Sequence, residues 1–350
     1  MGLLPGRPRV PVVPVGKRVH RGPGDSGQTC EEGRGLSGGD GRKGEGMILR
    51  AYARALPLKD EYDAIRLGFL IQRSVTLLWV NVPKDGRPYV GAFSGGKDSI
   101  VIKELARMAG VPVEWHYHQT TIDPPELVRF IRQEHPDVVW DKPKHGNLFI
   151  RAEKKGFPTW RSRWCCDEYK ESSVGASRTE ITGIRIAEGE RRKRTWTQCV
   201  MSHSKKPKTL IVMPIRLWSD EQVWEFIKYR GINYCSLYDE GFKRLGCIGC
   251  PLITPKQRQF EFDRWPGFER RWKLLFRRLW AARSGKPDRN GNEWWGSRHC
   301  DSWEELWDWW NGGQKNISQW RLDRGLRLKI APKKRCTTTP AMAGLMEAGP

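Results

Sequence analysis

The residues best suited to chemistry form a short polar loop, Ser94-Gly95-Gly96-Lys97-Asp98-Ser99. It follows an apolar stretch predicted as a strand, and a segment with helical periodicity begins near its end. Two adjacent glycines let backbone amides approach an anion closely, and a helix N-terminus adds oriented N–H donors. The hydroxyl groups of Ser94 and Ser99 can donate as well. The loop therefore predicts a phosphate-binding site between a strand and a helix.

This loop differs from the common phosphate loop G-x-x-x-x-G-K-[ST]. Residues 91–97 match its first seven positions, but Asp98 stands where that loop needs a Ser or Thr to hold Mg²⁺. A carboxylate there would face the phosphates directly unless it served a metal ion or capped the helix. The sequence therefore argues against a P-loop nucleoside triphosphatase.

Four of the nine cysteines fall into two close pairs, Cys165-Cys166 and Cys247-x-x-Cys250. The odd count favours reduced thiols, so clustered cysteines indicate metal ligands or redox groups. Four thiolates suffice for a tetrahedral zinc ion or an iron–sulfur cluster, and because adjacent cysteines are unusual in zinc sites, the pattern favours [4Fe–4S]. A redox disulfide between Cys247 and Cys250, or buried thiols without a ligand, are the alternatives.

Strand and helix candidates alternate after a helix expected over 60–80. The strand candidates are 89–93, 113–117, 138–140, 180–184 and 209–213, and the helix candidates between them are 99–108 and 124–133. Such alternation implies βαβ units. The predicted fold class is therefore α/β, with a Rossmann-like parallel sheet and, after it, a Trp-rich helical C-terminal extension.

Most of the 18 tryptophans lie in that extension, in two stripes at helical spacing. One stripe is Phe268, Trp272, Leu275, Phe276, Leu279 and Trp280, and the other is Trp303, Leu306, Trp307 and Trp310. Such stripes are typical of core packing, and the alternative is a platform on which nucleobases stack.

The charge balance points to anionic partners. The chain has 350 residues with 62 Lys+Arg and 40 Asp+Glu, a formal net charge of +22. That field attracts nucleotides or nucleic acid, although a GC-rich genome would produce the same bias. No run approaches the roughly 18 apolar residues of a membrane span, and prolines interrupt the first twenty residues, where a secretory signal would stand. We expect a cytoplasmic protein without a membrane partner.

Five motifs, in order and spacing, resemble the phosphoadenosine phosphosulfate (PAPS) reductase family of the PP-loop ATP pyrophosphatase, or adenine nucleotide alpha hydrolase-like, superfamily. They are the loop 94–99, Arg163-Trp164-Cys165-Cys166, Gly183-Ile184-Arg185 with Glu188 and the basic run 191–194, the segment 214–224, and the segment 233–247. The resemblance covers about residues 60–255 and implies an adenine nucleotide as ligand.

The resemblance also implies roles for individual residues. The loop would hold the phosphate or sulfate end of the nucleotide through Ser94, Gly95, Gly96, Lys97, Asp98 and Ser99, with Lys97 and Asp98 as catalytic candidates. Further contacts to the nucleotide would come from Arg185, Arg191 and Arg192, since guanidinium groups pair with phosphate bidentately. For any one arginine of the run, a solvated loop position is the alternative. The ligands of the [4Fe–4S] cluster, or of zinc, would be Cys165, Cys166, Cys247 and Cys250.

Two departures from the family pattern bear on the reaction. The family often has Asp-Thr-Gly after the second strand, where this chain has His118-Gln119-Thr120-Thr121. The nucleophilic cysteine of the iron–sulfur branch sits in a Glu-Cys-Gly tail motif, which is absent: Cys336 does not match it, and Cys300 between cationic neighbours is a weak candidate. His116 and His118 are further candidates at a strand end.

The sequence leaves three functions open. The first is sulfur transfer or sulfonucleotide reduction, with PAPS or adenylyl sulfate as substrate. The second is an ATP pyrophosphatase that uses ATP with Mg²⁺ and a nucleic-acid acceptor, as in DNA phosphorothioation or tRNA thiolation. The third is a non-catalytic phage protein that binds nucleotide and DNA.

Four regions are expected along the chain. Residues 1–46 are expected to form a disordered Gly/Pro/Arg-rich tail. The alternative is that translation starts at Met47, where patterned sequence begins. Residues 47–255 form the PAPS reductase-like PP-loop domain, 256–330 the helical extension, and 331–350 a second disordered tail.

Overall fold

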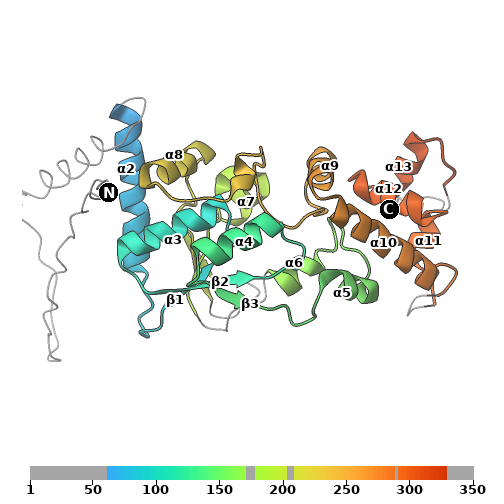
Figure 1. Cartoon of the computed structure of the whole chain (residues 1–350), viewed down its shortest axis with the longest axis horizontal. Coiled ribbons are helices and arrows are strands. Elements are labelled where there is room, and N and C mark those ends of the chain that lie inside the picture. The colour runs from blue at the N-terminus through green and yellow to red at the C-terminus, as the bar shows by residue number, and fades with distance from the viewer. Residues whose placement is uncertain (1–60, 171–177, 203–208, 288–290, 329–350) are drawn as a thin grey trace, which may run out of the picture. The chain divides into compact units, whose positions relative to one another are not determined.

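The computed structural model describes residues 61–170, 178–202, 209–287 and 291–328, and Figure 1 labels their elements where there is room. The strands are β1 (Tyr89–Ala92), β2 (Val113–His118), β3 (Val139–Asp141), β4 (Glu180–Ile181), β5 (Val200–Ser202) and β6 (Leu210–Val212). The helices up to the last strand are α2 (Glu61–Val80), α3 (Lys97–Ala109), α4 (Pro125–Glu134), α5 (Leu148–Lys155), α6 (Trp164–Tyr169), η1 (Ile186–Glu188) and α7 (Glu190–Thr195). Those after it are α8 (Asp220–Arg230), η2 (Ser236–Tyr238), α9 (Pro255–Arg264), α10 (Pro266–Arg283), α11 (Trp295–His299), α12 (Trp303–Asn311) and α13 (Ile317–Asp323).

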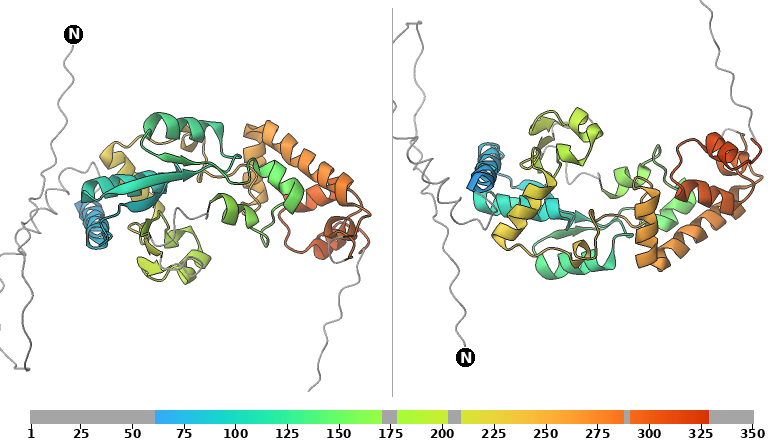
Figure 2. Two further views of the ribbon diagram at one scale, coloured as in Figure 1. Left: turned by 90° about the horizontal axis from the view of Figure 1, so that it is seen from below. Right: turned by 90° about the horizontal axis from the view of Figure 1, so that it is seen from above.

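The strands form one sheet in the order β3-β2-β1-β4-β6-β5. All neighbours are parallel except β5, which runs antiparallel to β6 at the edge. Figure 2 shows α4 and α7 on opposite sides of the strands. The predicted α/β fold with a Rossmann-like parallel sheet is confirmed.

The first strand and helix follow from local sequence. Gly91 in β1 lies under the indole of Trp115 in β2, where a Cβ would come within 2.2 Å of the ring, so only glycine fits. The apolar positions of α3 are buried, including Ile100, Val101, Ile102 and Leu105. Gly110 ends the helix with a φ of 63°, a left-handed C-cap that favours glycine. These features fix where β1 ends and α3 begins, and so fix the loop between them.

Some predicted strands are shorter in the structure. The candidate 180–184 is a strand only at Glu180–Ile181, because the chain beyond it packs against α3: a Cβ on Gly183 would lie 3.1 Å from Asp98 Cβ. The candidate 209–213 is a strand at Leu210–Val212. The edge strand β5 carries no apolar run that would have predicted it.

The Trp-rich segment is helical, and α10 packs against α5 and α12. Both stripes lie mainly in the core, with Trp272, Phe276, Trp307 and Trp310 all buried. The interpretation of the stripes as core packing is therefore confirmed for these residues.

The division into four regions stays a prediction, because residues 1–46 and 331–350 lie outside the described residues. Within the described ranges, no helix combines the length and the apolar character that crossing a bilayer requires.

Candidate nucleotide site and cysteine cavity

The loop 94–99 lies at the carboxyl end of β1, in the middle of the sheet. β1 pairs with β2 on one side and with β4 on the other. The chain builds the sheet outward through β2 and β3, and then crosses to β4 and β6 on the opposite side of β1. Open α/β sheets bind ligands where the strand order reverses in this way. The predicted phosphate loop therefore stands at the edge of the sheet where a ligand is expected.

The backbone of the loop turns directly into α3. Gly95 has a φ of +71°, and a Cβ there would lie 2.6 Å from Ile131 Cγ1. Gly96 is the N-cap of α3, and its carbonyl accepts a hydrogen bond from Ser99 Oγ over 2.8 Å. Ser94 is exposed beside it. The glycines thus bring an exposed hydroxyl and the N-terminus of a 13-residue helix together.

Two cations and two carboxylates form one ion-pair network behind this loop. Arg185 Nε donates to Asp98 Oδ1 over 2.7 Å, and Arg185 Nη2 donates to Asp220 Oδ1 over 2.5 Å. Lys97 Nζ lies 3.7 Å from Asp98 Oδ2 and 3.4 Å from Asp220 Oδ1. The side chains of Arg185 and Lys97 are 2% and 6% exposed, whereas those of Asp98 and Asp220 are 26% and 52% exposed. The carboxylates therefore balance the buried cations and still reach the surface.

The pKa values in the network follow from this pairing. Burial opposes the charged form of Arg185, but the Asp98 and Asp220 carboxylates outweigh it and raise the pKa of Arg185 above its usual value. Burial would likewise raise the pKa of Asp220, but the hydrogen bond from Arg185 and the charge of Lys97 hold that pKa below its usual range. Arg185 and Asp220 therefore stay charged at neutral pH.

The arginines predicted to contact the nucleotide occupy different places. Arg185 is buried against Asp98 and Asp220. Arg192, on α7, is half-buried, lines a cavity described below and lies 3.3 Å from Glu188. Arg191 is exposed on the same helix. Only Arg185 therefore touches the loop, and the contacts of all three with a nucleotide remain predictions.

The two histidines of β2 share one carboxylate. Asp141 Oδ2 lies 3.0 Å from Nδ1 of His116 and 3.2 Å from Nδ1 of His118. His116 is buried in the sheet and His118 is half-buried at the end of the strand. The arrangement joins the ends of β2 and β3.

The four cysteines of the two pairs line one cavity of about 220 Å³. Cys165 and Cys166 come from the first turn of α6, and Cys247 and Cys250 from the turn before α9. The cavity is also lined by four cations, Arg163, Lys170, Arg192 and Arg244. The structure thus places the two predicted pairs in the wall of one cavity, together with four cations and the carboxyl group of Glu261.

One cysteine of the cavity, Cys166, favours the thiolate form. A hydrogen bond from the Cys165 thiol, helped by Arg163, lowers the pKa of Cys166 to about 5 although burial opposes it. The same hydrogen bond, together with burial, raises the pKa of Cys165 well above its usual value. Burial raises the pKa of Cys247 to about 11, and the Lys170 charge opposes that rise.

The donor set fits the predicted group in chemistry. Thiolates are the ligands of iron–sulfur clusters and of structural zinc, and four of them face one cavity. As placed, no three His, Cys, Asp or Glu side chains of the described residues lie close enough to hold a metal ion. A bound group would therefore require the two pairs to draw together.

One segment connects the loop with the cavity. The hydroxyl of Tyr238 accepts a hydrogen bond from Lys97 N over 2.9 Å, and Lys97 Nζ donates to the carbonyl of Lys243 over 3.5 Å. Arg244, Gly246 and Cys247 then line the cavity. Residues 238–247 therefore touch the phosphate loop at one end and the cysteines at the other.

The sequence analysis did not single out Asp220, Tyr238 or Lys243. The signal was present, because Asp220 lies in the motif 214–224 and the other two in the motif 233–247. Of the two remaining cysteine candidates, only Cys300 is described, and it does not line the cysteine cavity. Cys300 is buried in the helical extension, and Cys336 lies outside the described residues.

The chain matches known proteins over this same region. Residues 88–253 match the family model described as phosphoadenosine phosphosulfate reductase domain. An uncharacterized protein of Methanocaldococcus jannaschii is 26% identical over 194 residues, which are 54% of this chain and 47% of that protein. The adenosine 5′-phosphosulfate reductase of Bacillus mycoides is 25% identical over 206 residues, which are 55% of this chain and 84% of the reductase.

A solved structure is similar as well. The phosphate complex of phosphoadenylyl-sulfate reductase from Candida auris has a TM-score of 0.39 and 18% identity, over 52% of this chain and 93% of that one. The chain spans about half the length of the archaeal relatives that it matches. As the five motifs predicted, the chain carries, over residues 88–253, a domain that belongs to the phosphoadenosine phosphosulfate reductase family.

Proposed function

We propose that the protein is an enzyme of sulfur transfer that depends on an adenine nucleotide. The loop 94–99 would hold the phosphate or sulfate end of the nucleotide. The observation that carries the proposal is the segment 238–247, which contacts the loop through Tyr238 and Lys243 and lines the cysteine cavity with Cys247. A nucleotide bound in the loop would therefore be connected, through this one segment, to the cysteines that line the cavity.

Each part of the loop has a distinct task in this proposal. The N-terminus of α3 and the Ser94 hydroxyl would donate hydrogen bonds to the anionic end of the nucleotide. Lys97 would neutralise its charge, and Arg185 would position Asp98. With ATP as the ligand, Asp98 and Asp220 would bind Mg²⁺, which proteins commonly hold by one or two carboxylates together with substrate phosphates.

The cysteine cavity would hold a [4Fe–4S] cluster, or a zinc ion, on Cys165, Cys166, Cys247 and Cys250. When bound, the group would supply a fixed charge beside the nucleotide and a covalent tie between α6 and the turn before α9. The cations Arg163, Lys170, Arg192 and Arg244 would stabilise the thiolates that such a group needs.

The leading reaction is sulfonucleotide reduction. A thiolate attacks the sulfur of PAPS or adenylyl sulfate, the S–O bond to the nucleotide phosphate breaks, and the nucleotide leaves. A dithiol then reduces the resulting thiosulfonate, which releases sulfite and leaves a disulfide. The proposal needs an accessible nucleophilic cysteine, which the family places in a tail motif that this chain lacks.

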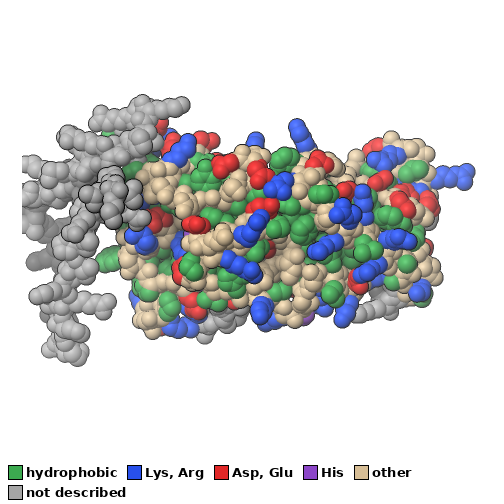
Figure 3. All heavy atoms as spheres, in the orientation of Figure 1, with side chains coloured by type: hydrophobic (Ala, Val, Ile, Leu, Met, Phe, Trp, Pro, Cys, Tyr) green, Lys and Arg blue, Asp and Glu red, His purple; other side chains and the backbone are tan. Residues whose placement is uncertain are grey.

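A second reaction is favoured by the burial of Cys300, which makes this cysteine, the nucleophile candidate that the sequence offered within the described residues but outside the cysteine cavity, inaccessible to a substrate. In this alternative an acceptor oxygen attacks the α-phosphorus of ATP, pyrophosphate leaves, and the adenylated acceptor is ready for sulfur. The net charge of +22 favours a DNA or tRNA acceptor. On the face that Figure 3 shows, Lys and Arg side chains are spread widely among acidic ones, so the charge on this face does not mark one acceptor site.

Product analysis distinguishes the two reactions. Protein purified without oxygen is given adenylyl sulfate or PAPS with a dithiol, and separately ATP with Mg²⁺, with and without nucleic acid. Sulfite with nucleotide release supports reduction, and AMP with pyrophosphate supports adenylation. If none of the mixtures yields either set of products, the proposal is contradicted.

Two variants tie the products to the loop. Asp98→Ala should abolish turnover, but it leaves Arg185 with one carboxylate and could disturb folding. Gly96→Ala is the second variant, because a Cβ there meets nothing closer than 3.4 Å, at the Tyr238 hydroxyl, so the chain should fold. Its methyl group would stand in the phosphate cradle and should reduce turnover at least tenfold.

A further inference from the structure

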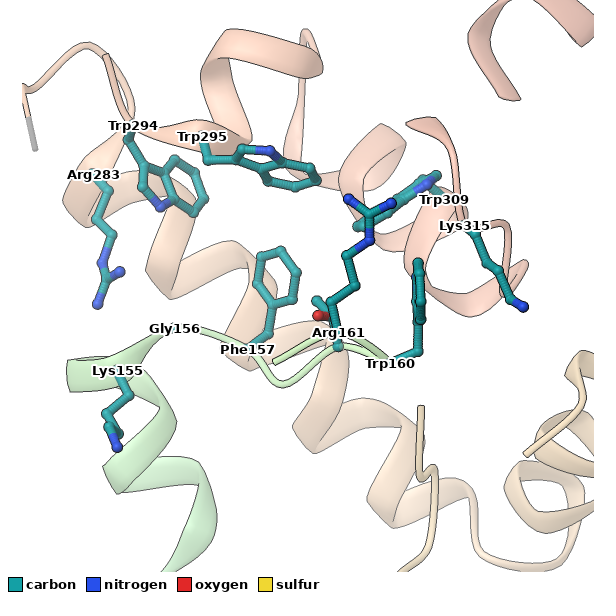
Figure 4. A pocket seen from close by; sticks show the side chains of 11 residues that line it. Lys155, Gly156, Phe157, Trp160, Arg161, Arg283, Trp294, Trp295, Trp309 and Lys315 are labelled. Atoms are coloured by element: carbon teal, nitrogen blue, oxygen red, sulfur yellow. The ribbon is translucent and has the colours of Figure 1, made fainter. Parts of the chain in front are cut away.

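A second cavity lies between the residues that follow α5 and the C-terminal helices (Figure 4). Its volume is about 300 Å³, at the small end of the range for ligand sites. It shares no lining residue with the cysteine cavity and includes none of the loop 94–99. Five of its eleven lining residues, including Trp295, Trp309 and Lys315, lie beyond the end of the family domain at residue 253. The domain family does not account for this pocket.

Aromatic rings form much of its wall. Trp295 is 40% exposed, unlike the buried tryptophans of the two core stripes. Its ring lies 5.1 Å from that of Trp309 and 6.3 Å from that of Phe157, centroid to centroid. Trp160 stands on the opposite side of the pocket, on the segment after α5. One face of Trp295 is stacked on the ring of His299, with centroids 4.6 Å apart, so the other face is the one on which a nucleobase of any kind could stack.

All the charged side chains that line the pocket are positive. Lys155, Arg161, Arg283 and Lys315 line the pocket, and no Asp or Glu does. Lys155 is paired with Glu168 over 2.6 Å, and Arg283 donates to the carbonyls of Glu153 and Lys154. The other two cations are therefore the ones available to a ligand.

Arg161 and Lys315 are exposed, and both lie over the ring of Trp160, at 4.8 Å and 5.3 Å from its centroid. Neither forms an ion pair with a carboxylate in the part of the chain that the structure describes. Figure 4 shows Arg161 extending from the segment after α5 toward the helix side of the pocket. An anionic group in the pocket would meet two uncompensated positive charges.

A buried donor in the wall also lacks a partner. Trp309 is 5% exposed, and its Nε1 has no hydrogen-bond acceptor among the described residues. Buried N–H groups are rarely left unpaired, and most other unpaired groups of this kind here lie away from the pocket. The wall of the pocket therefore contains a buried donor without an acceptor among the described residues.

We propose that this pocket binds a nucleobase and its neighbouring phosphate from a single-stranded nucleic acid. The base would stack on the face of Trp295 that His299 does not cover, and the phosphate would lie against Arg161 and Lys315, which lie over the ring of Trp160. The flat base and the anionic phosphate of a nucleotide unit match the aromatic face and the two cations of the pocket. The net charge of +22 also favours binding of a long polyanion. The inference is independent of the proposed function, because it uses no residue of the nucleotide loop.

The test is fluorescence anisotropy with the full chain and labelled single-stranded DNA and RNA of about 12 nucleotides, within the usual site sizes. Trp295→Leu should weaken binding about tenfold. Arg161→Gln should lower the slope of log affinity against log salt by about 0.7, the value for one lost phosphate contact on a single strand.

Matched controls come from outside the pocket. Trp79→Leu removes another exposed tryptophan, in α2, and Arg324→Gln removes another cation that lies over a tryptophan, 4.6 Å from the ring of Trp320. Both should bind as the wild type does. Trp295→Phe keeps an aromatic face and should restore most of the affinity lost in Trp295→Leu, which separates stacking from damage to the fold.

Three results would overturn the proposal. They are wild-type affinity in Trp295→Leu, equal losses in the pocket and control variants, and displacement of the labelled oligonucleotide by AMP as readily as by unlabelled oligonucleotide, which would make a free nucleotide the ligand of the pocket. Gly96→Ala should leave oligonucleotide affinity unchanged while it impairs turnover, so the two proposals can fail separately.

Discussion

Arg185 Nε donates to Asp98 Oδ1 over 2.7 Å, and this bond ties the turn after β4 to the first turn of α3. The two residues are 87 positions apart, and the guanidinium also holds Asp220. Because Arg185 is buried and Asp98 is partly exposed, the arginine orients the carboxylate that faces the nucleotide loop. The geometry of the loop therefore depends on a residue from the other half of the sheet.

Replacing Arg185 by Met should destabilise the fold. The change leaves two carboxylates close together without their shared donor, and we expect the free energy of unfolding to fall by about 2–3 kcal/mol, because hydrogen bonds to charged groups are the stronger ones. Urea denaturation measures the change. Arg191→Met is the control, since Arg191 is exposed and should alter stability by less than about 0.5 kcal/mol. Equal stability of Arg185→Met and wild type would show that the network is not structural.

Tyr238→Phe tests the contact between the loop and the connecting segment. The variant leaves Lys97 N–H without the hydroxyl that accepts its hydrogen bond over 2.9 Å. We expect a loss of about 1–2 kcal/mol in unfolding free energy, together with weaker nucleotide binding. Tyr234→Phe is the matched control, because the Tyr234 hydroxyl donates to exposed Asp239. If both variants lose the same amount, the Tyr238 hydroxyl has no special role.

His135 should make the fold sensitive to acid. Burial against Phe93 and Phe130, followed by the charge of Lys103, lowers the pKa of His135 to about 4. The unfolded chain has a histidine pKa near 6.5, so between about pH 6.5 and pH 4 the unfolded state binds more protons and stability falls as the pH falls.

Because His135 is partly exposed, solvent screening limits this loss to about 1–2 kcal/mol. Urea denaturation at pH 7 and at pH 4.5 measures it, and His135→Gln should reduce the difference between the two pH values. A difference that is unchanged in the variant would assign the acid sensitivity to other groups.

The cysteine cavity predicts a bound metal or cluster in protein purified without oxygen. Iron and acid-labile sulfide, or zinc, should be present in the wild type and largely lost in Cys250→Ser. Cys199→Ser is the control, since Cys199 lies outside the cavity and should retain the metal. Elemental analysis and the visible absorption spectrum read out the result, and equal metal content in the two variants would contradict the ligand assignment.

The sequence predicted the elements that depend on local patterns. The apolar run before Ser94, the two glycines and the apolar spacing of α3 are all local. The helix α8 was not predicted, although its capping box of Ser219 and Gln222 is local too. Parallel pairing followed from the alternation of strands and helices. The two cysteine pairs were visible as spacing, but only the fold could show that both face one cavity.

What the sequence could not show depends on distant contacts. Arginine is rarely fully buried, so nothing local marked Arg185 as an interior residue that holds two carboxylates. Helical spacing also does not distinguish a buried tryptophan from an exposed one, yet Trp272 is buried while Trp295 is exposed and lines a pocket. Such differences arise from packing between elements, which periodicity does not contain.

The proposed function depends on the binding of an adenine nucleotide by the loop 94–99. Isothermal titration calorimetry with ATP and Mg²⁺, and with adenylyl sulfate, tests it in the wild type, Gly96→Ala and Gly267→Ala. Gly267 lies near the start of α10, where a Cβ meets nothing closer than 3.8 Å, so its variant controls for adding a methyl group near a helix N-terminus. We predict that the wild type and Gly267→Ala bind one of the nucleotides equally well, and that Gly96→Ala binds it at least tenfold more weakly with unchanged stability. Equal affinity in all three proteins, or no binding by the wild type, would contradict the claim.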